Sequence, residues 1–191
     1  MMSDERIHLI VLFGGESAEH DVSCTTAAHV LAAADPAKYR ITPIGISTDG
    51  QWAIAEDAIT ALAQGAGALP SRLDPSGTRV SPTPMLAEAH ETPERTVVLP
   101  LLHGPMGEDG TVQGLLKMAE VAFVGAGVLG SAVGMDKVVM KRLLMDAGIP
   151  VARYCTAAWH EREGLDFNAI RDRLGLPLFV KPANLGSSVG V

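Results

Sequence analysis

Short aliphatic runs alternate along the chain with segments whose apolar residues recur at helical spacing. The first run, residues 7–13, is nearly all aliphatic, which is typical of a parallel strand covered on both faces. Comparable apolar runs predict further strands over residues 40–47, 51–55, 96–102, 121–124, 151–157 and 178–181. Helical spacing predicts helices over residues 24–34, 111–119, 135–147 and 166–174. Strands and helices in this order indicate an α/β fold with a parallel sheet.

Small polar residues, glycines and prolines set the predicted ends of these elements. Ser23 stands where the N-cap of the first helix is expected, and Pro43 indicates that the second strand is an edge strand or contains a bulge. Residues 64–95 are rich in Gly, Pro, Ser, Thr and charge. That composition predicts a long surface excursion with one short helix at residues 85–89.

Two glycine-rich loops follow predicted strands. The first, residues 14–23, lacks the third glycine of the dinucleotide-binding fingerprint. It contains Glu19 beside a helix start, where position alone favours stabilisation by the helix dipole over ligand binding. The second, residues 103–111, has His103 at a strand end and two adjacent acidic residues that suit helix capping better than a metal ion. Because ligands of open α/β sheets bind at the carboxyl ends of strands, both loops are candidate walls of a site.

The last stretch joins a lysine to a loop rich in glycine and serine. Lys181 ends a predicted strand, and residues 186–190 offer backbone N–H groups and two hydroxyls, the donors that a phosphate or an oxyanion needs. The common phosphate loop has its lysine after the last glycine, so it does not match. Lys137 and Lys141 lie one helical turn apart, and position alone favours two solvated side chains.

The net charge and the N-terminal segment argue against nucleic-acid-binding, secreted and membrane proteins. A net charge of −7 argues against a nucleic-acid partner. The apolar run after the charged N-terminus is too short for a secretory signal or a membrane span, so we expect a cytoplasmic protein without a membrane partner. Cys24 and Cys155 lack metal-binding or redox spacing, which predicts two free thiols.

Five segments occur together in the order of one known family. They are residues 14–23, 102–114, 131–137, 147–150 and 180–190. Together these segments resemble the D-alanine–D-alanine ligases of the ATP-grasp superfamily. The resemblance implies a doubly wound, Rossmann-like parallel-sheet domain over residues 1–135, followed by the beginning of an ATP-grasp domain over residues 136–191.

The resemblance also implies an activity. In the family, the carboxylate of one D-alanine attacks the γ-phosphate of ATP to give an acyl phosphate, and the amine of a second D-alanine displaces phosphate. The expected product is D-alanyl-D-alanine for peptidoglycan, made by a homodimer that uses ATP, D-alanine and Mg²⁺. The family chain continues well past Val191 and carries its magnesium ligands there. We therefore expect no metal ligand in this chain and no activity of the 191-residue polypeptide alone.

The family pattern assigns four residues to the amino-acid substrates. Glu19 matches the carboxylate that holds the ammonium of the first D-alanine, and Ser187 matches a catalytic serine that links Glu19 to a downstream tyrosine. His103 matches a histidine near the first substrate's carboxylate, and Ser188 is expected to bind substrate.

Three more residues match the part of the family pattern that binds ATP. Lys137 and Lys181 resemble its phosphate-contacting lysines, and Gly186 opens the loop that closes over the phosphates. For Lys137, as for Glu19 and His103, family membership thus favours a functional role that position alone does not.

Two other functions stay open at this point. Some relatives join D-alanine to D-lactate or D-serine, and the second substrate is selected mainly beyond the part of the family pattern present here. The other alternative is a non-catalytic N-terminal module that dimerises or binds a D-amino acid.

Overall fold

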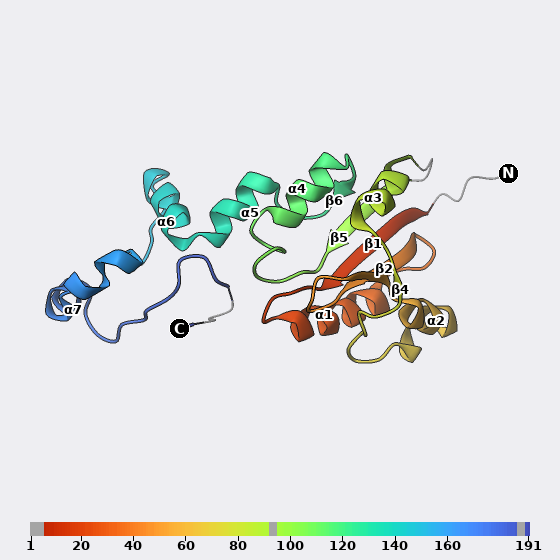
Figure 1. The fold of residues 1–191 in the computed structure, drawn as a ribbon, viewed down its shortest axis with the longest axis horizontal. Helices are drawn as coiled ribbons and strands as arrows, with labels where there is room; N and C mark the ends of the chain where they lie inside the picture. The colour runs from red at the N-terminus through yellow and green to blue at the C-terminus, as the bar shows by residue number, and fades with distance from the viewer. Residues whose placement is uncertain (1–5, 92–94, 187–189) are drawn as a thin grey trace. The chain divides into compact units, whose positions relative to one another are not determined.

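A computed structural model describes residues 6–91, 95–186 and 190–191 of the chain (Figure 1). The chain divides into two compact units, Met1–Ala132 and Val133–Val191, and each is described by itself. The domain boundary expected after residue 135 stays a prediction.

The first unit is built on one six-stranded sheet in the order β4-β3-β2-β1-β5-β6 (Figure 1). The strands are β1 (Ile7–Gly14), β2 (Tyr39–Ile46), β3 (Trp52–Ile54), β4 (Thr78–Arg79), β5 (Thr96–Pro100) and β6 (Ala122–Phe123). β1 pairs in parallel with both β2 and β5, and β5 pairs in parallel with β6. β3 and β4 add antiparallel pairs at one edge.

Helices cover both faces of this sheet (Figure 1). α1 (His20–Ala33) and α2 (Glu56–Gln64) pack on one face, whereas α3 (Pro82–Glu91) and α4 (Thr111–Met118) pack on the other. The side chains of β1 alternate between two cores: Leu9, Val11 and Phe13 face α1, while Ile10 and Leu12 face α3 and α4. The predicted doubly wound α/β fold is confirmed.

Two prolines lie within strands because their missing N–H groups fall where no ladder bond is needed. Pro43 was expected at an edge or a bulge, but β2 is an interior strand with partners on both sides. The carbonyl of Pro43 accepts from Ala55 on the β3 side, so its ring nitrogen faces the end of that three-residue strand and not β1. Pro100, at the end of β5, pairs with Leu12 of β1.

Residues 64–95 contribute more than the predicted surface excursion. Besides α3, which extends the short helix predicted there, they form the 3-10 helix η1 (Ala66–Ala68) and β4. Leu73 and Leu86 are 1% and 0% exposed and belong to opposite cores. The prediction of a surface excursion was wrong at Leu73. A single apolar residue among polar neighbours gives no periodic signal, yet Leu73 packs into the core beside α1.

The second unit consists mainly of short helices. α5 (Val128–Met135), which was not predicted, crosses the division between the units, and α6 (Lys137–Asp146), η2 (Trp159–Gly164) and α7 (Phe167–Leu174) follow it. α6 and α7 were predicted from their apolar spacing. Each begins after an aspartate, Asp136 or Asp166, whose carboxylate accepts from the first free backbone N–H groups.

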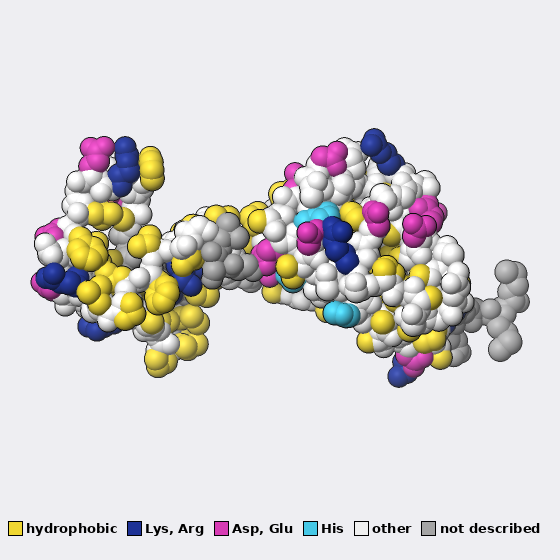
Figure 2. Space-filling view, turned by 90° about the horizontal axis from the view of Figure 1, so that it is seen from below, with side chains coloured by type: hydrophobic (Ala, Val, Ile, Leu, Met, Phe, Trp, Pro, Cys, Tyr) yellow, Lys and Arg dark blue, Asp and Glu magenta, His cyan; other side chains and the backbone are white. Residues whose placement is uncertain are grey.

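The strands predicted over residues 151–157 and 178–181 are absent from the structure, although both segments are described. Within the described part of the second unit no strand runs beside either segment, and a β-strand needs a partner for its N–H and C=O groups. Phe179 and Val180 are 76% and 83% exposed, and hydrophobic side chains (yellow) gather on this unit in Figure 2.

No helix within residues 6–91 and 95–186 combines the length and the apolar content required to cross a membrane.

Leu73 provides a test of the core contribution made by residues 64–95. Because its side chain is buried, Leu73→Ala should lower the free energy of unfolding by roughly 2–5 kcal/mol. Urea denaturation followed by the fluorescence of Trp52 in β3 measures the change. The control Ser71→Ala, at an exposed position two residues earlier, should stay within about 0.5 kcal/mol of the unmodified chain. Equal effects of the two substitutions would contradict the assignment.

Candidate functional site

Two loops leave the sheet side by side at the carboxyl ends of neighbouring parallel strands. The loop after β1 leads into α1 on one face, and the loop after β5 leads into α4 on the other. The boundary between β1 and β5 is therefore the point where the direction of winding reverses. Open α/β sheets bind ligands in the crevice at such a point.

The loop after β1 is fixed against the end of β2. Gly14 has a φ of +87°, and a Cβ built on it would lie 2.2 Å from the carbonyl oxygen of Ile46, so no larger residue fits. The next N–H, that of Gly15, donates to the same oxygen at 2.7 Å. These contacts set the path of the chain toward Glu19, which is half-buried and precedes the first residue of α1.

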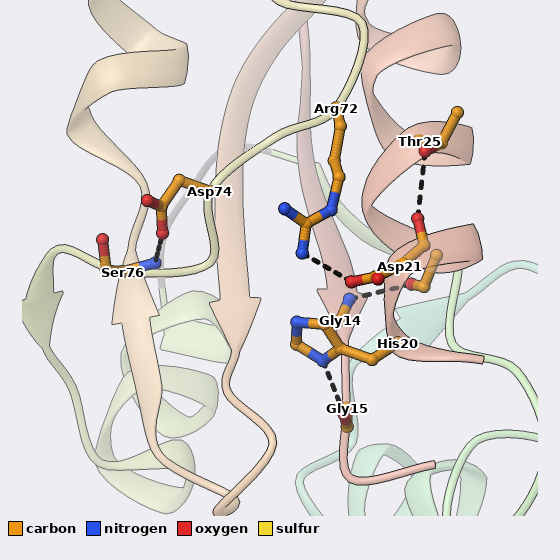
Figure 3. A network of polar contacts seen from close by, with 9 residues as sticks. Gly14, Gly15, His20, Asp21, Thr25, Arg72, Asp74 and Ser76 are labelled. Atoms are coloured by element: carbon orange, nitrogen blue, oxygen red, sulfur yellow. Dashed lines mark hydrogen bonds and ion pairs between the residues drawn. The ribbon is translucent and has the colours of Figure 1, made fainter. Parts of the chain in front are cut away.

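The start of α1 differs from the prediction. Glu19 occupies the N-cap position, and its N–H donates to Ser17 Oγ at 3.2 Å. Ser23, the predicted N-cap, lies inside the helix and is fully buried, where its hydroxyl contacts two strand ends. The helix begins four residues early because His20 turns its ring back and donates from Nδ1 to the carbonyl of Gly15 at 2.7 Å (Figure 3).

The acidic residues of the second loop hold its backbone. Glu108 accepts from the N–H of Gly104 at 2.7 Å. Asp109 accepts from the N–H of Met106 through one oxygen and from the N–H of Thr111 through the other. Asp109 thus bonds to the first residue of α4, but the N-cap position is Gly110, which has no side-chain cap hydrogen bond, and Glu108 holds only the loop. Within the described residues no group of three or more His, Cys, Asp or Glu could hold a metal ion.

The structure brings Glu19 next to the second loop. A Cβ built on Gly104, which has a φ of +69°, would lie 3.5 Å from Glu19 Oε2 and 3.3 Å from Ser17 Cβ. Gly104 directly follows His103. The Nε2 atom of His103 is buried and has no hydrogen-bond partner among the described residues. A carboxylate and an unsatisfied imidazole nitrogen therefore lie on two facing loops.

Lys137 and the segment before the last loop meet within the second unit. The N–H of Lys137 donates to the carbonyl of Ala183 at 3.0 Å, and its ammonium contacts the carbonyl oxygen of Leu185. These contacts place Lys137 beside the residue that precedes Gly186. The side chain of Lys181 is exposed.

The predicted serines of the last loop and a hollow in the second unit are not part of the contact between Lys137 and residues 183–185. Ser187 and Ser188 lie outside the described residues, so their predicted roles stay predictions. A hollow lined in part by Ile149, Tyr154 and Arg173 includes neither of the two lysines in its wall.

Comparison with known families covers both units. The family model described as D-ala D-ala ligase N-terminus matches residues 8–126, more than half of the chain. The chain belongs to the D-alanine–D-alanine ligase family. A second model of this ligase family, described as its C-terminus, matches residues 143–191.

Individual ligases of the family resemble the chain along nearly its whole length. The D-alanine–D-alanine ligase of Paenarthrobacter aurescens is 45% identical over 97% of this chain and 52% of its own length. The ligase of Bradyrhizobium sp. is 46% identical over 100% of this chain and 53% of its own. The chain therefore spans about half the length of the curated relatives it matches.

Solved ligase structures share the fold. The D-alanine–D-alanine ligase from Coxiella burnetii matches with a TM-score of 0.74 at 32% identity, covering 97% of this chain and 53% of that one. The VanG D-Ala:D-Ser ligase from Enterococcus faecalis matches with a TM-score of 0.69 at 32% identity, covering 96% and 54%.

Several residues that shape the site in this ligase family member carry no recognisable sequence signal. The sequence predicts no structural role for His20, and it predicts Ser23 as a helix cap. Gln113, which donates from Nε2 to the carbonyl of Gly107 at 2.7 Å, lies in a helix where its polarity suggests exposure. A small polar residue near a helix start, such as Ser23, suggests a cap. Its hydrogen bonds to the ends of β1 and β5 become apparent only in the structure.

Asp109 makes the second loop sensitive to acid. Partial burial raises the pKa of Asp109, but the hydrogen bonds from Met106 and Thr111 together outweigh it, so the pKa lies below its ordinary value. Because folding lowers this pKa, the ionised carboxylate stabilises the folded chain at pH values above the pKa of Asp in the unfolded chain, about 3.9. That contribution is lost as the pH falls through the folded pKa.

The Asp109→Asn variant tests this dependence. Asparagine offers one carbonyl oxygen in place of two carboxylate oxygens, so the variant should be less stable than the unmodified chain at pH 7. The difference should shrink as the pH is lowered below about 4. Urea denaturation at a series of pH values measures it, and a difference that stays constant on acidification would rule out the assigned role.

Proposed function

We propose that this chain supplies the first-amino-acid site and part of the ATP site of a ligase that joins two D-alanine molecules for peptidoglycan synthesis. The observation that carries the proposal is the position of Glu19 against Gly104, the residue after His103, whose buried Nε2 has no hydrogen-bond partner among the described residues. A zwitterionic amino acid presents an ammonium and a carboxylate a few ångströms apart. The two facing loops offer one partner of suitable character to each group.

Glu19 and His103 have distinct tasks in this proposal. The carboxylate of Glu19, the residue at the N-cap position of α1, receives the ammonium of the first D-alanine. The Nε2 atom of His103 is the natural hydrogen-bond partner for the carboxylate of the same molecule, since a buried polar atom left unsatisfied is unfavourable. The two contacts hold the first D-alanine by both of its charged groups.

The residues of the second unit act on ATP. Lys137 and Lys181 neutralise phosphate charge, and Gly186 opens the loop that covers the phosphates, with Ser187 and Ser188 orienting the substrate. The carboxylate of the first D-alanine attacks the γ-phosphorus, ADP leaves, and an acyl phosphate forms. The amine of the second D-alanine then displaces phosphate. Phosphoryl transfer depends chiefly on such positioning and charge neutralisation.

Magnesium is part of the proposed activity, but the described residues of this chain do not form a site for it. Glu108 and Asp109 are already engaged by backbone N–H groups, and no acidic cluster lies elsewhere in the described ranges. No step of the proposal is therefore assigned to a metal held by these residues. The homodimeric state and the cytoplasmic location suggested by the family also belong to the proposal.

D-alanine is the favoured second substrate. The curated relatives at 42–47% identity are named D-alanine–D-alanine ligases, whereas the VanG D-Ala:D-Ser ligase is 32% identical. The contacts of Glu19 and His103 concern the first amino acid and do not distinguish among second substrates.

The activity is tested on a chimera that continues this chain with the second half of the Paenarthrobacter aurescens ligase. Phosphate release from ATP and Mg²⁺ should depend on D-alanine, and D-alanyl-D-alanine should accumulate. In this chimera, Glu19→Gln should raise the KM for the first D-alanine about 10- to 100-fold, which corresponds to the loss of a hydrogen bond to a charged group.

A neighbouring carboxylate in the same loop is the control for Glu19. Glu16 lies toward Gly50 of the β2–β3 turn, where a built Cβ would be 2.8 Å from Glu16 Oε1, and not toward Gly104. Glu16→Gln should leave the KM for D-alanine nearly unchanged. Equal losses for the two variants would refute the assignment of the ammonium to Glu19.

Lys181 is tested by its effect on the nucleotide. Lys181→Ala in the chimera should raise the KM for ATP or lower kcat by at least about 10-fold, with a smaller effect on the KM for D-alanine, because it removes one phosphate clamp. Lys117→Ala, at an exposed site in the last turn of α4, removes the same charge from a residue that has no proposed role and should have little effect. A loss confined to the KM for D-alanine would contradict the role in ATP binding.

A further inference from the structure

The hydrogen bonds between β1 and β5 follow the regular alternation of a parallel ladder. The N–H of His8 donates to the carbonyl of Arg95 at 3.0 Å, and the N–H of Leu101 donates to the carbonyl of Leu12 at 2.8 Å. In such a ladder, every second residue of a strand bonds to the same partner strand through both its N–H and its C=O. The rung after Leu101 N–Leu12 O should join the N–H of Gly14 to the carbonyl of Leu101.

The hydroxyl of Ser23 occupies that rung. The N–H of Gly14 donates to Ser23 Oγ at 2.8 Å, and Ser23 Oγ donates to the carbonyl of Leu101 at 2.5 Å. A hydroxyl can accept and donate at once, so both backbone groups are satisfied. The ends of β1 and β5 are therefore joined through two hydrogen bonds with the hydroxyl oxygen between them, and not by one direct hydrogen bond. Figure 3 shows the start of α1 lying against Gly14 and Gly15.

This inserted hydroxyl lies at the root of both candidate loops. Glu19 is one helical turn before Ser23, whose N–H donates to the Glu19 carbonyl at 3.0 Å. His103 follows Leu101 by two residues. The first loop is otherwise held toward β2, through Gly15 and Ile46, and the second loop is held by its own acidic side chains.

We propose that Ser23 is a positioning residue whose hydroxyl sets the separation of the two loops that hold the first amino acid. The inference rests on the proposed function of Glu19 and His103. Without the hydroxyl, Gly14 and Leu101 form the direct rung, β1 and β5 close at their carboxyl ends, and the partners of the ammonium and the carboxylate no longer match the substrate. Ser23 itself touches no substrate.

The test compares three variants of the 191-residue chain, namely Ser23→Ala, Ser23→Cys and the control Thr25→Ala. The Thr25 hydroxyl donates to the Asp21 carbonyl within α1 at 3.0 Å, so its removal deletes a hydrogen bond that joins no strands. D-alanine is titrated into ¹⁵N-labelled protein to measure Kd, thermal unfolding measures stability, and crystal structures give the distance from Gly14 N to Leu101 O.

The expected results distinguish a change in the separation of β1 and β5 from a general loss of stability. Ser23→Ala should weaken D-alanine binding by about 10-fold or more, since small misplacements of binding groups have large effects. Its Gly14 N–Leu101 O distance should shorten toward about 2.9 Å, a direct hydrogen bond. Ser23→Cys retains a side chain large enough to separate the strands, so its Kd should stay within about threefold of the unmodified chain, and Thr25→Ala should leave Kd unchanged.

Two outcomes would overturn the role of Ser23. One is a Kd for Ser23→Ala equal to that of Thr25→Ala; the other is an unchanged Gly14–Leu101 distance in the Ser23→Ala crystal. If Ser23→Ala does not fold, a loss of binding in the folded Ser23→Cys variant also counts against the role. If the unmodified chain shows no response to D-alanine, the proposed first-amino-acid site fails, and the crystal distance alone decides the inference about Ser23.

Discussion

Hydrogen bonding along both edges of β1 is the constraint on which the first unit depends. On one edge the chain bonds to β2, from the N–H of Ile7 to that of Gly15, and on the other edge it bonds to β5. Because all three strands are parallel, their carboxyl ends lie at one edge of the sheet. The loops that carry Glu19 and His103 must leave from that edge, whatever their own sequences.

Elements with strong local signals could be predicted from the sequence. The signals for β1, α6 and α7 each lie within a few neighbouring residues, although the caps Asp136 and Asp166 were predicted as parts of the helices. The segment around Leu73 has no such pattern, since its one buried side chain is specified by the surface of α1 that it covers. Its N–H donates to the carbonyl of Cys24, far away in sequence, and no periodicity reports such a contact.

The second unit shows the limit of apolar runs as strand signals. The segments 151–157 and 178–181 have the composition of buried strands, yet composition specifies only a preference for a pleated, half-buried surface. In the described residues from 133 onward no side chain is classed as buried, and no strand offers a ladder. Arg153 donates instead to the carbonyls of Arg173 and Leu174 at the end of α7, which satisfies groups that a helix end leaves free.

The candidate site was partly predictable for the same physical reasons. Glu19 and His103 lie in loops that follow predicted strands, so the parallel sheet alone brings the two loops together. The sequence contains no information on their separation, which a third side chain sets from inside α1. A serine near a helix start has two available uses, capping its own helix or bonding to a neighbouring strand. The early turn of the chain at His20, fixed by its bond to Gly15, carries Ser23 past the cap position and leaves only the second use.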